Sequence, residues 1–174
     1  YAELLGSVTR QLPVESDDAT RLKTLTKEWQ ALPNSAKNDT MVEHYINLLL
    51  EQGSVAQAET FLREHLKKQW SEPLAALYGR INSEDAHKQL DTAKGWLKKH
   101  ADSAALRLTL ARLAMRNEQW GKAVEYLEES IELEKSADAY QELIRLLQHL
   151  GETERAAQVA AESSAFSGIA LAPL

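Results

Sequence analysis

Apolar residues recur at helical spacing along most of the chain, most clearly within residues 104–134. The first stripe in this segment, spaced at i, i+4, i+7 and i+8, consists of Leu106, Leu110, Leu113 and Ala114. A second stripe follows at once and consists of Ala123, Val124, Leu127, Ser130 and Ile131. Each stripe gives one apolar face to a helix, so the segment predicts two consecutive amphipathic helices.

The polar residues between the stripes predict a turn at 117–121, with Gly121 loosening the chain. A short turn between two helices is typical of an antiparallel helix hairpin. Ala111, Ala114 and Ala123 are small enough to let the two backbones approach closely, with larger side chains filling the space beside them. This hairpin therefore predicts tight packing at Ala123.

Similar pairs of stripes recur, which predicts a stack of hairpins. The expected organisation is an N-terminal helical segment 1–36, a repeat array 37–163 with repeats 37–69, 71–101, 103–135 and 136–163, and a tail 164–174. The alanine and leucine spacing resembles the tetratricopeptide (TPR) consensus, although Arg107 and Lys135 replace its tryptophan and proline. The predicted fold is all-α, a TPR-like α-solenoid of about ten helices.

Local signals place several boundaries in this array. Gly53 is expected to end a helix over 37–52, and Ser54 to cap its partner. Pro73 suits the first turn of a short helix, and a longer helix is expected from 83 to His100. The uncharged tail 164–174 leaves two alternatives open, disorder or packing against a neighbouring groove.

Composition and charge narrow the functional classes. The net charge of −6 argues against non-specific nucleic-acid binding. The chain has no cysteine, which excludes a disulfide framework, a thiolate zinc site and c-type haem attachment. No apolar run reaches the ~20 residues that span a bilayer. Because the chain begins at Tyr1, we expect it to be a fragment from which an anchor could have been removed.

The sequence contains no recognisable catalytic arrangement, so we expect no enzyme, no metal site and no cofactor. None of the five histidines forms an HExxH motif or an i, i+4 pair. His65 and His100 lie near the C-terminal ends of second helices, where the negative end of the helix dipole stabilises a cation. The alternative is that His65, His100 or His149 ligates haem.

The first helix of each hairpin in such a stack lines the concave face. The residues predicted to line a partner groove are Leu108, Arg112, Met115, Arg116, Gln141, Arg145 and Gln148. Arginines gather on the first helix of the central hairpin and glutamates on the second. This charge sorting permits two interpretations, neutralisation between neighbouring helices or a basic groove for an acidic or carboxylate-ended peptide.

Over most of the chain, and most clearly in residues 74–133 and 136–157, the order and spacing of residues resemble the C-terminal half of the bacterial HemY family. The features that carry the resemblance are the short helix at 74–81 followed by Asn-Ser-Glu-Asp, and then Trp96-Leu97 before His100-Ala101-Asp102. That family comprises TPR proteins associated with protohaem biosynthesis and is distinct from the flavin-dependent protoporphyrinogen oxidase that sometimes shares its name. The resemblance implies a bacterial inner-membrane protein anchored by N-terminal helices outside this chain, whose orientation the chain does not determine.

Three functions remain open at this point. The first is a non-catalytic scaffold that binds proteins of the haem pathway near the membrane. The second is a haem or porphyrin carrier, and the third is a general assembly module for envelope complexes. The expected partner is a protein or peptide, with contact to a membrane only through a segment that this chain lacks.

Overall fold

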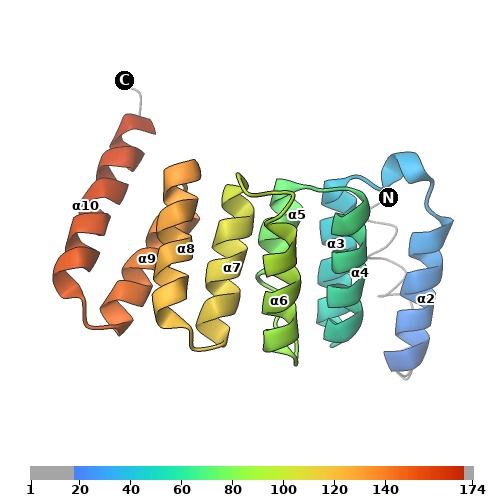
Figure 1. The fold of residues 1–174 in the computed structure, drawn as a ribbon. Helices are drawn as coiled ribbons and strands as arrows, with labels where there is room; N and C mark the ends of the chain where they lie inside the picture. The colour runs from blue at the N-terminus through green and yellow to red at the C-terminus, as the bar shows by residue number, and fades with distance from the viewer. Residues whose placement is uncertain (1–17, 171–174) are drawn as a thin grey trace. The chain divides into compact units, whose positions relative to one another are not determined.

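The computed structural model describes residues 18–170, and these form helices with no strand among them (Figure 1). Nine α-helices and one short 3-10 helix lie within this range, which confirms the all-α prediction. Residues 1–17 of the predicted N-terminal segment and the end of the tail at 171–174 lie outside the described residues. The chain divides into two compact units, residues 1–84 and residues 85–174.

Consecutive helices build each unit. The first unit contains α2 (Asp18–Ala31), the 3-10 helix η1 (Asn34–Ala36), α3 (Asp39–Glu51), α4 (Val55–Lys68) and α5 (Glu72–Tyr78). The second unit contains α6 (Ala86–Trp96), α7 (Ala104–Arg116), α8 (Trp120–Leu133), α9 (Ala137–His149) and α10 (Thr153–Ala170). The predicted repeat 71–101 therefore gives α5 to the first unit and α6 to the second.

An aromatic cluster joins three helices of the first unit. Trp29 of α2 stacks on Tyr45 of α3 with ring centroids 4.5 Å apart. Phe61 of α4 meets both rings edge-on, at 5.4 Å from Trp29 and 4.9 Å from Tyr45. Offset stacks and edge-to-face contacts are the favourable aromatic geometries, so this cluster fixes α2 against the α3–α4 hairpin.

Side-chain oxygens cap the N-termini of α3, α5, α7 and α9. The side chains of Asn38, Ser71, Ser103 and Ser136 accept hydrogen bonds from backbone N–H groups three residues later, at 3.0 to 3.4 Å. Each cap satisfies one of the N–H groups that a helix start leaves without an intrahelical partner. Ser54 stands at the start of α4 as expected, but its side chain makes no cap hydrogen bond.

The hairpin turns within α3–α4, α7–α8 and α9–α10 share one backbone motif. Gly53 (φ 71°) and Gly151 (φ 77°) adopt left-handed conformations after α3 and α9. The next residue donates its N–H back across the helix end, from Ser54 to Leu49 at 2.9 Å in the first case. This is the Schellman arrangement, which satisfies the last carbonyl groups of the first helix and sets the start of the second.

In the α7–α8 turn the left-handed residue is Glu118 (φ 57°), which is not glycine. The same two hydrogen bonds form, from Glu118 to Met115 at 3.0 Å and from Gln119 to Ala114 at 2.9 Å. The expectation that Gly121 belongs to this turn is wrong, because α8 begins at Trp120 and includes it. The turn is complete within three residues, so the helix resumes before the glycine.

Small side chains lie where α7 and α8 approach each other. Ala111, Ala114 and Ala123 are fully buried, as the hairpin pattern predicts. They belong to one apolar core of the second unit, which contains Leu108, Ala111, Ala114, Ala123, Val124, Leu127, Ala139, Leu143, Leu146, Leu147 and Ala156. This core joins α7, α8, α9 and α10 into one packed body.

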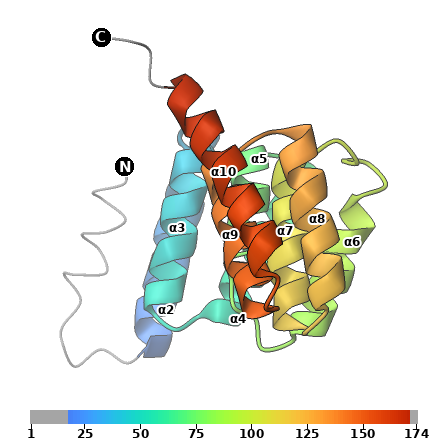
Figure 2. The same ribbon diagram turned by 90° about the vertical axis from the view of Figure 1, so that its left-hand side faces the viewer.

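Two helix ends differ from the sequence prediction. Helix α6 starts after the Asp85 cap but ends at Trp96 rather than His100, and Gly95, a poor helix former, lies in its last turn. Helix α10 continues to Ala170, beyond the predicted end at residue 163. It runs beside α9 (Figure 2), where Phe166 lies 5.9 Å from Tyr140 between ring centroids. The described part of the tail is therefore helix that packs against α9.

Candidate functional site

The candidate groove is a pocket of about 460 Å³ between α7 and α9, at the point where α8 begins. Its lining residues are Met115, Trp120, Glu142, Arg145, Leu146 and His149. Met115 comes from the last turn of α7, and the four residues from Glu142 to His149 come from α9. An apolar wall with a few polar groups beside it is the usual composition of a ligand pocket.

Trp120 supplies the aromatic wall because of the turn that precedes it. The compact turn at Glu118 makes Trp120 the first residue of α8, beside the end of α7. Its ring packs on the core of the second unit and lies 5.0 Å from the imidazole of His149. Helix α8 therefore contributes to a site that the sequence pattern assigned to first helices.

Two of the seven predicted groove residues, Met115 and Arg145, line this pocket. Gln141 and Gln148 are exposed on α9 but are not among its lining residues. Trp120, Leu146 and Glu142 were not among the predicted residues. A tryptophan at a hairpin boundary was the available signal for Trp120, and His149 was considered as a haem ligand rather than as a groove residue.

Leu108 and Arg112 are buried within the second unit. Leu108 is 6% exposed and belongs to the apolar core. The Arg112 side chain donates from Nε to Glu142 Oε1 at 2.8 Å, and its Nη2 lies 2.6 Å from the same oxygen. Asp138 lies 3.7 Å from Nη2. The charge of Arg112 is therefore neutralised by α9, as the first interpretation of the charge sorting expects.

Arg107 follows the same interpretation, because its Nε lies 2.9 Å from Glu129 on α8. Arg116, one turn beyond Arg112, is half-buried at the end of α7. Burial lowers its pKa, the nearby Arg112 charge lowers the pKa further, and Glu142 opposes both effects. An arginine nevertheless stays protonated in proteins, so Arg116 remains a partly desolvated cation beside Met115.

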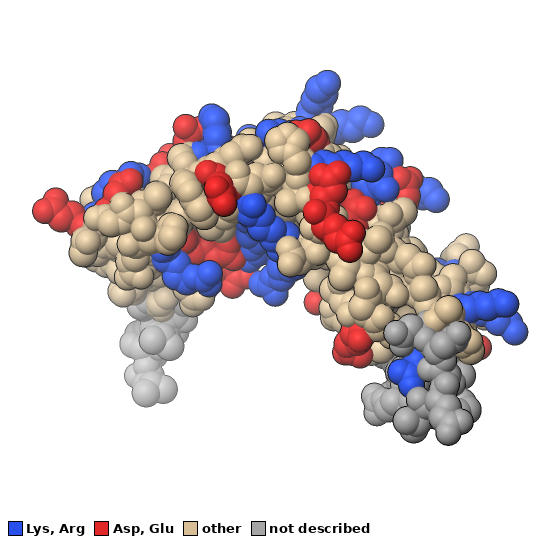
Figure 3. Space-filling model, turned by 90° about the horizontal axis from the view of Figure 1, so that it is seen from below, with Lys and Arg blue, Asp and Glu red and all other residues tan. Residues whose placement is uncertain are grey.

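Among the described residues, the face of the molecule shown in Figure 3 carries no extended patch of one charge sign. Basic and acidic side chains of the described residues lie next to one another there. At the pocket itself, Arg145 is an exposed cation among the lining residues. Local cations beside an apolar wall can recognise a carboxylate that neighbours an apolar side chain.

Comparison with solved structures finds the same helical architecture elsewhere. The MamA RS-1 ArsTM double mutant matches with a TM-score of 0.58 at 16% identity, covering 95% of this chain and 94% of that one. MamA 41-end from Desulfovibrio magneticus RS-1 matches with a TM-score of 0.58 at 17% identity and the same coverage. MamA MSR-1 C2 matches with a TM-score of 0.56 at 11% identity, covering 88% and 91% of the two chains.

The chain has a TPR-like α-solenoid fold. At this level of identity the similarity shows the fold alone, and it does not bear on the resemblance to the HemY family. No protein-family model matches the chain, and no curated protein sequence matches it. The site must therefore be interpreted from its own residues.

The three histidines considered as haem ligands lie in different surroundings. His65 Nε2 is buried without a hydrogen-bond partner in the described part of the first unit, and burial lowers the pKa of this imidazole. His149 is exposed beside Trp120, and His100 is half-buried after α6. Residues 18–170 contain no group of three metal-ligating side chains, and none of their helices has the length and apolar character to cross a bilayer.

Proposed function

We propose that this chain is a non-catalytic protein-interaction scaffold whose α7–α9 groove binds a short peptide. The observation that carries the proposal is the apolar wall of Met115, Trp120 and Leu146 with Arg145 beside it. An apolar side chain of the partner would occupy the wall, and an adjacent carboxylate would pair with Arg145. A planar guanidinium can bind a carboxylate through two hydrogen bonds, which adds specificity to the contact.

Arg145 is a better residue than Arg112 for testing this proposal. Reversing the charge of Arg112 would place a carboxylate beside Glu142 and Asp138, so a loss of binding could follow from a damaged fold. Arg145 is exposed and has no ion pair within the described residues, so Arg145→Glu changes the groove with little effect on packing. Lys88→Glu is the matched control, because Lys88 is exposed on α6 away from the pocket.

The test is fluorescence anisotropy with a labelled Glu-Glu-Leu-Glu-Glu peptide. We expect Arg145→Glu to weaken binding about tenfold, since an attractive ion pair becomes a repulsive one. The wild-type affinity should also fall as salt rises. Lys88→Glu has the same change in net charge and should bind nearly as the wild type does. Equal affinities for Arg145→Glu and Lys88→Glu would show that the peptide does not use this groove.

The resemblance of residues 74–157 to the HemY family supports a narrower proposal. We propose that the partners are proteins of protohaem biosynthesis and that the chain is a domain of a protein at the bacterial inner membrane. A pull-down from a bacterial lysate, with Arg145→Glu as the control bait, should recover late enzymes of that pathway. Recovery of envelope proteins without any of those enzymes would favour the general assembly module instead.

A further inference from the structure

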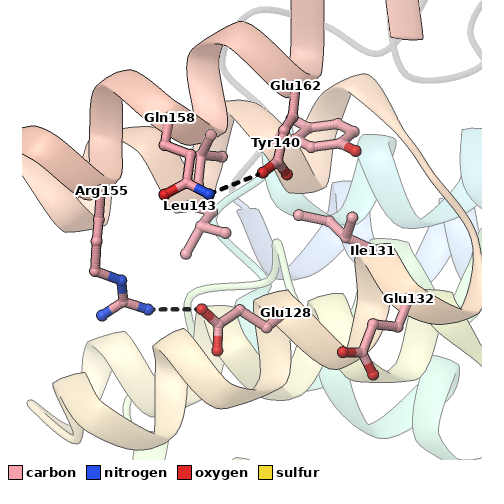
Figure 4. Close-up of a pocket in the computed structure, with 9 residues that line it drawn as sticks. Glu128, Ile131, Glu132, Tyr140, Leu143, Arg155, Gln158 and Glu162 are labelled. Carbon is pink, nitrogen blue, oxygen red and sulfur yellow. Dashed lines mark hydrogen bonds and ion pairs between the residues drawn. The ribbon is translucent and has the colours of Figure 1, made fainter. Parts of the chain in front are cut away.

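A second pocket, of about 410 Å³, is lined by residues of α8, α9 and α10 (Figure 4). Its apolar part is made by Ile131, Leu143 and Val159, with the ring of Tyr140 beside them. Leu143 and Tyr140 are each 2% exposed, so this floor is continuous with the core of the unit. The second pocket shares no lining residue with the α7–α9 groove.

The rim of this second pocket is acidic. Glu128 and Glu132 lie one turn apart on α8, and Glu162 faces them from α10 (Figure 4). The one cation among the lining residues is Arg155, which reaches Glu128 and Glu152 at 2.6 Å each. The guanidinium of Arg155 is therefore paired with Glu128 and Glu152, and it does not neutralise Glu132 or Glu162.

Glu132 and Glu162 are left without a cation in the described structure. Glu162 accepts only a long hydrogen bond of 3.5 Å from the neutral amide of Gln158. Glu132 has no ion pair among residues 18–170. The side chains of Glu132 and Glu162 are both exposed at the pocket. The site therefore combines an apolar floor with two carboxylates from opposite walls, and this charge favours a cationic occupant.

We propose that this pocket binds a basic segment of a partner protein, in which an apolar residue is flanked by lysine or arginine. The apolar side chain lies against Ile131, Leu143 and Val159, and the flanking cations pair with Glu132 and Glu162. Like charge excludes the acidic peptide proposed for the α7–α9 groove. The second unit thus offers two sites of opposite charge preference, one on each side of α9.

The test is fluorescence anisotropy on the full chain with a labelled Lys-Lys-Leu-Lys-Lys peptide. Glu132→Gln/Glu162→Gln removes the two carboxylates and keeps their size. Glu43→Gln/Glu51→Gln makes the same change in net charge at exposed positions of α3 in the first unit. We expect the pocket variant to bind about tenfold more weakly than wild type, and the control variant to bind within about twofold of wild type.

The peptide itself supplies the second arm. Replacing its leucine with serine should weaken binding to wild type, because the apolar floor then loses its occupant. Equal losses in the pocket and control variants would overturn the proposal in favour of general attraction to an acidic protein. Absence of binding up to 1 mM peptide would overturn it as well.

A further outcome concerns a second copy of the chain as occupant. Sedimentation of the wild type at increasing concentration would then show a dimer that Glu132→Gln/Glu162→Gln abolishes, and this would replace the partner segment with self-association. A monomer at every concentration, together with the expected peptide result, supports the proposal. Neither result depends on the acidic peptide, so the two sites succeed or fail separately.

Discussion

Glu118 holds a backbone conformation that its side chain does not favour. A left-handed φ brings the Cβ of an L-residue too close to its carbonyl oxygen, at a cost of about 1–2 kcal/mol. Gly53 and Gly151 occupy the same position in the two corresponding turns without that cost. The α7–α8 turn keeps its conformation because its two backbone hydrogen bonds and the packing of Trp120 determine it.

Glu118→Gly should therefore stabilise the protein. The relief of strain exceeds the extra entropy that glycine gives the unfolded chain, so we expect a gain of about 0.5–1 kcal/mol in the free energy of unfolding. Urea denaturation followed by circular dichroism measures it. Glu154→Gly, at an exposed helical position in the first turn of α10, should instead be destabilising. A lower free energy of unfolding for Glu118→Gly would show that the glutamate side chain stabilises the fold by more than the backbone strain destabilises it.

The Arg112–Glu142 pair gives a second prediction at this scale. Both side chains are shielded from water, with 9% and 17% of their surfaces exposed. Arg112→Ala leaves Glu142 without its guanidinium partner and should cost about 2–4 kcal/mol. Adding Glu142→Ala removes the unpaired charge, so the double variant should be more stable than the sum of the two single changes predicts. Additive losses in this double-mutant cycle would show that the pair is not coupled.

At the scale of the helix, periodicity located most elements because each helix has one apolar face. The same periodicity placed Leu108 and Arg112 in the partner groove, whereas both are buried. The reason is that a helix in a stacked array contacts both its hairpin partner and the next repeat. Helix α7 consequently buries Leu108, Thr109 and Arg112 in addition to the expected stripe. A single sequence does not show that Glu142 of α9 pairs with Arg112 of α7. Arg112 was therefore predicted to bind a partner.

The pocket between α8 and α10 was missed for a related reason. Two of its glutamates, Glu128 and Glu132, belong to an acidic run on α8, which the pattern of one helix cannot distinguish from a solvated outer face. The residues that α10 contributes to the pocket, from Arg155 to Glu162, lie within the predicted repeat 136–163, and the site forms where this helix packs beside α9. The pocket therefore depends on the packing of three helices, which the pattern of any one helix does not show.

Ala123→Trp tests the close approach of α7 and α8. Ala123 is fully buried beside Ala111 and Ala114, and this contact cannot admit an indole without moving a helix. Overpacking should lower the free energy of unfolding by about 1–3 kcal/mol or more. Lys122→Trp adds the same ring at the neighbouring exposed position and should have little effect. Matching thermal melts for the two variants would place the helix contact elsewhere.

At the scale of the whole molecule, the α-solenoid fold predicts that stability is local. Each hairpin of such an array packs against its neighbours, so the free energy of unfolding is approximately a sum of repeat and interface contributions. The aromatic cluster of α2, α3 and α4 and the apolar core of α7 to α10 are separate bodies of contacts, in the first and second unit respectively. Damage to one core should therefore open its own helices first.

Leu143→Ala and Leu25→Ala make this prediction testable by native-state hydrogen exchange. Each truncates a buried leucine, in the second and first unit respectively, and should cost about 2–5 kcal/mol locally. In Leu143→Ala, amide exchange should accelerate most in α9 and α10 and remain near the wild-type rate in α2 and α3. Leu25→Ala should give the reverse pattern. Uniform acceleration across both units in either variant would mean that the chain unfolds as one cooperative body, and the two cores would then have to be treated as a single source of stability.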